Sequence, residues 1–196
     1  MLNYAAVCKH CNSVLKRNLF PITGKRRSDA KDPGRLKSEG ALLIYPIGHV
    51  DDDPETLIEF RGISPRPRVA SGFDRLRTMT TIEIFRLDDW RTRKSLIHDR
   101  LEWIEKLFWA LRQRDRGAPA VDVTEARQAI GRLTSPTFRH ANCLRSFLRL
   151  YESDPDEAKA VLADASEYLA SYSPSSESSS RRSTQAIRGR RDGRGR

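Results

Sequence analysis

Two cysteines near the start of the chain, Cys8 and Cys11, have the spacing of metal ligands. A Cys-x-x-Cys turn presents two thiolates to one zinc ion, which is half of the usual tetrahedral set. The pair alone is a weak signal, because two thiolates seldom hold zinc without further ligands. His10 lies between them and could be recruited, although a loop histidine without a role is more common. The other half of a zinc site is not evident, since the third cysteine is Cys143.

Two other groups have the composition of metal sites. His140 and Cys143 are three residues apart in an expected helix, so both could lie on one face and join the two N-terminal cysteines. The pattern favours a core position for Cys143, because cysteine is among the most buried residue types. His49 precedes the acidic run 51–53, and helix-capping acids beside a turn histidine explain that group more simply than a metal.

A basic stretch follows the cysteine pair, and its side chains could contact the phosphates of a nucleic acid. Its members in the candidate site are Lys16, Arg17, Lys25, Arg26 and Arg27. A merely solvated loop is an equally good interpretation. The whole chain carries a net charge of +10, but residues 173–196 hold seven arginines against two acidic residues, a net +5 that is half of this excess. Charge therefore suggests a polyanionic partner without locating the site.

Composition restricts the class of protein. A length of 196 residues with 38% hydrophobic residues suits one ordinary domain and an appendage. Three cysteines, two of them in one Cys-x-x-Cys, do not make a disulfide framework and fit a reducing compartment. No apolar run reaches membrane-spanning length, and the first residues lack the layout of a signal peptide. We therefore expect a cytoplasmic protein without a membrane partner.

The elements that must position these residues indicate an α+β fold that is mostly helical. Residues 8–20 suggest a knuckle and a short helix whose apolar contacts are Val14, Leu15 and Leu19. Residues 24–40 read as an exposed basic loop, and 41–45 as a buried strand or extended segment. Acidic residues and a proline at 51–55 favour a helix start, while residues 56–60 are compatible with helix or strand.

The second half of the chain has stronger periodicity. Residues 78–87 alternate enough to suggest a strand. Asp88 or Asp89 is then expected to cap a helix that reaches about Arg114. Its buried stripe comprises Leu96, Ile97, Leu101, Ile104, Leu107, Phe108 and Leu111. Three further helices are expected at 124–133, 135–151 and 155–172, followed by a disordered Ser- and Arg-rich tail at 173–196.

An ordered set of segments carries a family resemblance over roughly residues 1–150. The segments are Asn3, Cys8-x-x-Cys11-Asn12, Lys16, Phe20-Pro21, Glu39 to Pro46, Asp52 to Glu55 with Leu57 and Phe60, Thr81-Ile82, and Leu133 to Pro136 with Phe138. The first of these segments, from Asn3 to Pro21, resemble the second half of an HNH endonuclease module, and the match continues downstream. The resemblance is to a bacterial HNH family found beside ATPases in phage-defence operons and retron systems.

The resemblance implies that residues 1–23 are part of a ββα-metal fold, followed by the loop 24–40 and a mixed, then helical, region at 41–172. It implies metal-dependent hydrolysis of phosphodiester bonds in nucleic acid, most simply double-stranded DNA. Cys8 and Cys11 match structural zinc ligands. Asn3 matches the asparagine that orients a histidine-bearing loop. Asn12 matches the helix position at which the family places a ligand of the catalytic metal, and its amide oxygen would suit Mg²⁺.

The chain also departs from the family pattern. The upstream Cys-x-x-Cys and the strand with the general-base histidine would precede Met1, and Asp88-Asp89 stand where relatives tend to have Asn-Arg. We therefore expect an N-terminally truncated form, inactive as written. A late start codon or a decayed gene is favoured over a partner chain that supplies the first half. The alternative function is a non-catalytic module that binds nucleic acid or an ATPase partner.

Overall fold

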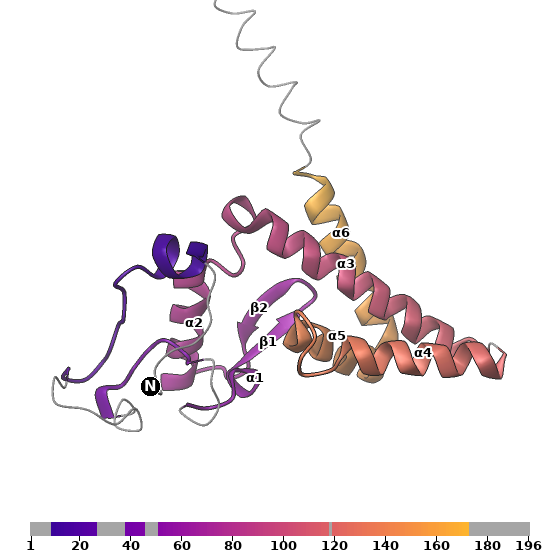
Figure 1. The fold of residues 1–196 in the computed structure, drawn as a ribbon, viewed down its shortest axis with the longest axis horizontal. Coiled ribbons are helices and arrows are strands. Elements are labelled where there is room, and N and C mark those ends of the chain that lie inside the picture. Colours follow the sequence, from indigo (N-terminus) through magenta and orange to yellow (C-terminus); the bar gives the residue numbers. More distant parts are fainter. Residues whose placement is uncertain (1–8, 27–37, 46–50, 118, 173–196) are drawn as a thin grey trace, which may run out of the picture.

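The computed structural model describes residues 9–26, 38–45, 51–117 and 119–172. Predictions for Asn3, Cys8, Arg27 and the tail 173–196 lie outside these residues. Within them the chain is mostly helical and has one two-stranded antiparallel sheet, which agrees with an α+β class (Figure 1). The elements are the π-helix η1 (His10–Lys16), α1 (Pro54–Leu57), β1 (Ile58–Arg61), β2 (Ser64–Pro67), α2 (Phe73–Phe85), α3 (Trp90–Asp115), α4 (Ala120–Leu133), α5 (Ala141–Ser153) and α6 (Pro155–Ala170).

The long helix α3 organises the C-terminal half of the molecule, and α4, α5 and α6 all pack against it (Figure 1). Asp89 caps it by accepting hydrogen bonds from the backbone N–H groups of Arg91, at 3.0 Å, and Thr92, at 3.4 Å. The predicted stripe is buried except for Leu96, which is half-buried. The most deeply buried large side chains of this core are Phe147, Ile104, Leu107, Leu111 and Leu144. The prediction of this helix and its face is confirmed.

The helix expected at 135–151 begins later than predicted, at Ala141. Residues 134–140 form turns, and His140 has a left-handed backbone with φ of 56°. The left-handed backbone of His140 is incompatible with a right-handed helix, so the regular helix begins only after it. The turn into α6 is tight, and Asp154 accepts a hydrogen bond from the backbone N–H of Glu157 at 2.9 Å.

Residues 56–60, for which the sequence allowed either helix or strand, contain the end of a short helix and the start of a strand. Asp53 caps the short helix α1 by accepting from the N–H of Glu55 at 3.0 Å, and strand β1 follows at once. A two-residue turn, Gly62 and Ile63, joins β1 to β2. Gly62 has φ of 57°, and a Cβ there would lie 2.8 Å from the Val161 side chain of α6. The glycine thus permits both the turn and the close contact of the hairpin with α6.

The strand predicted at 78–87 is wrong, because this segment belongs to helix α2. Its buried residues recur at helical spacing and are Arg77, Thr78, Thr81 and Ile82. The first three form hydrogen bonds with Ala41, Leu57 and Ile44 respectively. The alternation of Ile82, Ile84 and Leu87 favoured a strand, but this pattern is weaker than these tertiary contacts. Arg86, with φ of 47°, ends the helix in a left-handed conformation.

The N-terminal segment has little core of its own. No residue of η1 is buried, and the predicted apolar contacts Val14 and Leu19 are 48% and 52% exposed, so that prediction is wrong for these two. Leu15 is half-buried. Residues 41–45 are extended as expected, with Leu43 and Ile44 buried. Among the described helices, none combines the length and the apolar character needed to cross a membrane.

Candidate nucleic-acid interface

The π-helix η1 carries the residues that follow the first cysteine of the pair. It packs against α2 at the end where α2 leads into α3 (Figure 1). The backbone N–H of Arg17 reaches back five residues to the carbonyl of Asn12 at 2.8 Å, which closes the wide turn. Arg17 then takes φ of 48° and ψ of −127°, a backbone region that costs a non-glycine residue about 1–3 kcal/mol. Wide helical turns and strained residues of this kind are frequent at functional sites.

Cys11 is half-buried on η1 and contacts the start of α3. The Arg93 guanidinium donates a hydrogen bond from Nη1 to Cys11 Sγ at 3.2 Å. Arg93 lies at a kink in α3, with φ of −124° and ψ of 29°. A cation beside a sulfur favours the thiolate, which is the form that binds metals. Sequence reasoning missed Arg93, because nothing local indicates a contact across 82 residues.

The predicted zinc site cannot be assembled from the described residues. Cys8 lies outside them, and no three His, Cys, Asp or Glu side chains in the described part of the chain gather as metal ligands. Cys11, His140 and Cys143 therefore do not form a common group. Zinc at Cys8 and Cys11 stays a prediction in which Cys11 is the described ligand.

His140 and Cys143 have separate structural contacts. Cys143 is 1% exposed and donates to the Gly62 carbonyl at 3.4 Å, and burial raises the pKa of its thiol to about 12. It is a core residue, as the sequence favoured. The Nε2 atom of His140 lies 2.9 Å from Asp99 Oδ2 on α3. Burial outweighs the hydrogen bond to the Asp99 carboxylate and lowers the pKa of His140 below its usual value.

Asn12 and the basic residues occupy the exposed side of this segment. Asn12, Arg17, Lys25 and Arg26 are exposed, and Lys16 is half-buried. Arg17 Nε donates to the carbonyl of Val14 at 3.1 Å, and Arg26 Nη2 donates to that of Phe20 at 3.2 Å. These bonds fix the two guanidinium groups near the backbone. Residues 9–26 contain five Lys or Arg and no Asp or Glu, so the segment is positively charged throughout.

A short backbone pairing positions Lys25 and Arg26. Residues 21–24 run antiparallel to 39–42, with the bridge Ile22–Ala41 at its centre. The N–H of Gly24 donates to the carbonyl of Glu39 at 2.9 Å, and a Cβ at Gly24 would lie 3.0 Å from that oxygen. The absence of a side chain thus allows the close approach of these two chain segments.

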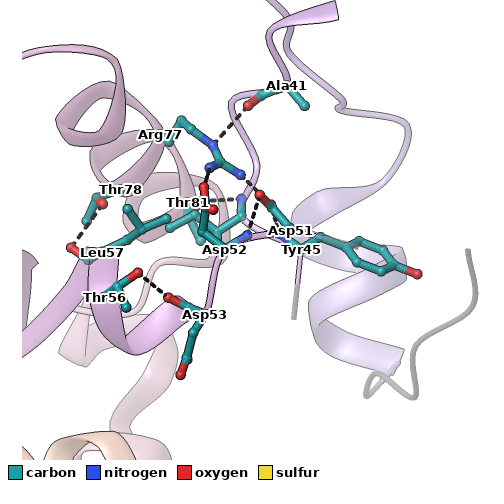
Figure 2. Close-up of polar contacts among 11 residues, drawn as sticks. Ala41, Tyr45, Asp51, Asp52, Asp53, Thr56, Leu57, Arg77, Thr78 and Thr81 are labelled. Atoms are coloured by element: carbon teal, nitrogen blue, oxygen red, sulfur yellow. Dashed lines mark hydrogen bonds and ion pairs between the residues drawn. The ribbon is translucent and has the colours of Figure 1, made fainter. Parts of the chain in front are cut away.

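The junction between this segment and α2 is polar, and Arg77 is at its centre (Figure 2). Its Nε donates to the carbonyl of Ala41 at 3.1 Å, and its Nη2 and Nη1 pair with Asp51 and Asp52. Asp51 also accepts the N–H of Tyr45 at 2.9 Å. Burial alone would raise the pKa of Asp51, but the N–H groups of Tyr45 and Asp52 and the Arg77 guanidinium hold it below its usual value.

The Arg77 junction explains the acidic run at 51–53. Asp51 neutralises a buried arginine, and Asp53 caps α1, so their main contacts are structural, as the sequence suggested for the capping acids. Thr81 adds a hydroxyl that accepts the N–H of Ile44 at 3.0 Å, and Thr78 donates to the carbonyl of Leu57 at 3.3 Å. The polar face of α2 thereby fixes the extended segment 41–45 and α1 in place (Figure 2).

Comparisons with known proteins found no matching family model, no matching curated protein and no matching solved structure. Functional inference therefore depends on the residues and on their arrangement in the described segments.

Proposed function

We propose that this chain carries the half of an HNH-type nuclease module that contains the cysteine pair and the helix after it. The proposed substrate is nucleic acid, with duplex DNA as the first choice. The observation that supports this proposal is the exposed, uniformly basic segment 9–26, in which Asn12 lies on a helix directly after Cys11. A basic segment without acidic residues of its own favours a polyanion. The Arg93 contact to Cys11 favours a thiolate next to that surface.

Each residue has a distinct role in the proposed module. Cys8 and Cys11 hold zinc as two of its ligands, and Asn12 offers its amide oxygen to a hard cation such as Mg²⁺. Lys16, Arg17, Lys25, Arg26 and Arg27 contact phosphates, and Asn3 orients the loop that bears the general base. A divalent metal in such a module stabilises the charge that develops on the scissile phosphate.

The proposed cleavage needs a histidine-bearing strand and a second cysteine pair. The 196-residue sequence holds a single Cys-x-x-Cys, and the one histidine in residues 1–23 is His10, between its two cysteines. We propose hydrolysis for a polypeptide or complex that includes those parts. The 196-residue chain by itself is expected to bind nucleic acid without cutting it.

Binding and cleavage of plasmid DNA test the proposal. The double variant Lys16→Gln, Lys25→Gln removes two charges and none of the backbone hydrogen bonds that fix Arg17 and Arg26. It should lower the slope of the logarithm of affinity against the logarithm of salt concentration by about 2. The control is Arg127→Gln, Arg132→Gln, two exposed residues of α4. Equal slopes for both variants would contradict a basic interface at 9–26.

The cleavage assay adds an independent result. The chain alone, incubated with supercoiled plasmid and Mg²⁺, should leave the plasmid intact. Nicking that disappears with EDTA and persists in the Asn12→Ala variant would contradict the assigned roles. Nicking that is lost in Asn12→Ala would show that the general base of the reaction is a residue other than the expected histidine.

A partner-binding module is the second candidate function. Trp109 of α3 is 62% exposed and Val121 of α4 is 69% exposed, and exposed tryptophans are enriched at protein interfaces. In this alternative the helices α3 and α4 dock onto a partner such as an ATPase. Absence of salt-dependent DNA binding by the 196-residue chain would favour it over the nuclease module.

A further inference from the structure

A second group of arginines lies on the hairpin and α5, outside the segment 9–26. It comprises Arg66 on β2, Arg68 directly after β2, and Arg145 and Arg149 on α5, and we call it the arginine cluster. Side chains two apart on a strand, or four apart on a helix, share a face. The cluster thus combines two guanidinium groups from the hairpin with two from a helix about 80 residues later.

Among the described residues, two glutamates form ion pairs with side chains of the arginine cluster. Glu55 is engaged by Arg145, which donates from Nε at 2.9 Å and from Nη2. Glu59 is shared by Arg66, at 2.7 Å, and Arg68, at 3.9 Å. Two glutamates therefore serve three arginines, and Arg149 is the fourth cation.

Arg149 is held in place by a hydroxyl rather than by a carboxylate among the described residues. Its Nη2 donates to Ser146 Oγ at 3.0 Å. That oxygen also accepts the N–H of Phe60 at 3.2 Å and donates to Asn142 Oδ1 at 3.4 Å, which uses the ordinary hydrogen-bonding capacity of a serine. Ser146 is buried, so the guanidinium is anchored to a fixed point of the core.

The electrostatic environment of Arg149 agrees with this geometry. Partial burial and then repulsion from Arg68 lower the pKa of Arg149, while Glu55 and Glu59 only partly offset them. Crowded cations repel each other, and a bound anion would relieve that repulsion. A guanidinium group presents a planar fork that matches two oxygens of a phosphate.

We propose that Arg66, Arg68 and Arg149 form a second phosphate-contacting surface, which binds the backbone of nucleic acid. This inference rests on the proposed function, because the polyanion is taken from it. Arg145 has a supporting role, since it pairs with Glu55 and donates to the Thr134 carbonyl at 2.6 Å, so Glu55 offsets the charge of Arg149 only in part. The surface contacts phosphates alone, so its contribution is uniform across sequences.

Salt-dependent binding of the full chain to a short duplex DNA tests the surface. Arg149→Gln should weaken binding about fivefold to tenfold at moderate salt and reduce the salt slope by about 1. The pair Arg68→Gln, Arg149→Gln should reduce the slope by about 2. Arg149→Lys should restore most of the slope, since a lysine retains the charge. Arg127→Gln, with the same loss of charge on α4, is the control and should change the slope by less than half as much as Arg149→Gln.

The outcomes separate this inference from the proposed function. Unchanged slopes in Arg149→Gln and in the double variant, with a reduced slope in Lys16→Gln, Lys25→Gln, would overturn the second surface alone. The reverse result would overturn the interface at 9–26 and retain the arginine cluster. A competition assay with labelled DNA tests whether the cluster prefers nucleic acid. If polyglutamate of equal charge competes as well as unlabelled DNA, and Arg149→Gln abolishes this competition, the nucleic-acid assignment of the cluster is wrong. A wild-type chain without salt-dependent binding would overturn both. Circular dichroism melts of each variant identify any loss of affinity that comes from unfolding.

Discussion

The helical region 90–170 and the described N-terminal residues, 9–26 and 38–45, are stabilised in different ways. In the first, α3, α5 and α6 bury a shared apolar core in which Phe147 and Leu144 are at most 1% exposed. In the second, η1 buries none of its residues and Leu43 and Ile44 are buried, while its polar links are the Arg93 contact to Cys11 and the junction around Arg77. The residues with candidate chemistry therefore lie on the part of the molecule with the smaller core.

This difference has a thermodynamic consequence. Regions with few buried apolar contacts open locally at a lower free energy than the core. A bound metal can replace a missing core, because ligand binding in small zinc sites contributes directly to folding. We therefore expect core substitutions to change global stability, and N-terminal substitutions to change local protection and binding.

The largest effect is expected in the helical core. Phe147→Ala removes a side chain that is 1% exposed and that packs edge-on against Phe108, with ring centroids 6.4 Å apart. The lost burial and the resulting cavity should lower the free energy of unfolding by about 3–5 kcal/mol. Urea titrations followed by circular dichroism measure this change.

The matched substitution in the N-terminal segment is Leu19→Ala. Leu19 is 52% exposed, so its removal should cost less than about 0.5 kcal/mol in the same titration. If Leu19→Ala destabilises the protein as much as Phe147→Ala, the two regions form one cooperative core and the comparison fails.

The second largest effect is expected at the Arg77 junction, where the two regions meet. Arg77→Gln leaves the Asp51 carboxylate, whose side chain is 11% exposed, without its guanidinium partner. Loss of one member of a buried ion pair should cost about 2–4 kcal/mol at neutral pH. Arg75→Gln, an exposed neighbour on α2, serves as the control and should cost less than about 0.5 kcal/mol.

The pH dependence of this substitution has a defined sign. The pKa of Asp51 in the folded protein is lower than its ordinary value of 3.8. The stabilisation by the ionised carboxylate is thus complete above pH of about 3.8 and is lost as the pH falls through the folded-state pKa. The difference in unfolding free energy between the wild type and Arg77→Gln should therefore shrink in acid. A difference that grows as the pH falls would mean that Asp51 is not the main partner.

The same two regions differ in how well the sequence predicted them. Helix α3 and the helices around it follow from apolar residues at helical spacing and from capping acids such as Asp89. Residues 78–87 were mistaken for a strand, because the buried stripe of α2 holds Arg77 and two threonines beside Ile82 and is therefore largely polar. The hairpin was missed in part, since Pro65 and Pro67 argue against a strand unless it has an open edge.

The candidate site shows the limit of local patterns more clearly. Spacing identified Cys11 and the basic residues around η1, but it gave no sign that Arg93 reaches the sulfur across 82 residues. The same holds for the arginine cluster, where Glu55 meets Arg145 across 90 residues. Such pairings depend on how the hairpin and the helices pack. This packing cannot be predicted from the residue types alone.

A moderate effect is expected at the turn between α5 and α6. Asp154→Ala removes the side chain that accepts the N–H of Glu157 and should cost about 1 kcal/mol. Asp154→Asn keeps a capping oxygen and should cost only a few tenths of a kcal/mol, through the lost charge at the helix start. Thermal unfolding of both variants separates the capping bond from the charge. Equal losses would assign the whole effect to charge.

The last comparison of the two regions involves no substitution and therefore no change in stability. It measures how fast a reagent modifies each cysteine of the wild-type protein. Cys11 is half-buried beside a guanidinium, whereas the Cys143 thiol is 1% exposed and has its pKa raised to about 12 by burial. Iodoacetamide should therefore modify Cys11 at least about a hundredfold faster, because Cys143 reacts only when the core opens. Tryptic cleavage after Lys9 separates Cys8 from Cys11, so mass spectrometry follows each thiol individually.

Zinc added before the reagent makes the labelling experiment a test of the metal prediction as well. If Cys8 and Cys11 bind zinc, the ion should slow the modification of both thiols together and leave the rate at Cys143 unchanged, since that rate depends on opening of the helical core. Protection of Cys11 without Cys8 would rule out a shared ion. Equal rates at Cys11 and Cys143 without zinc would mean that the N-terminal segment is as well protected as the core. The chemistry-bearing part of the molecule would then need neither a metal nor a partner to hold its shape.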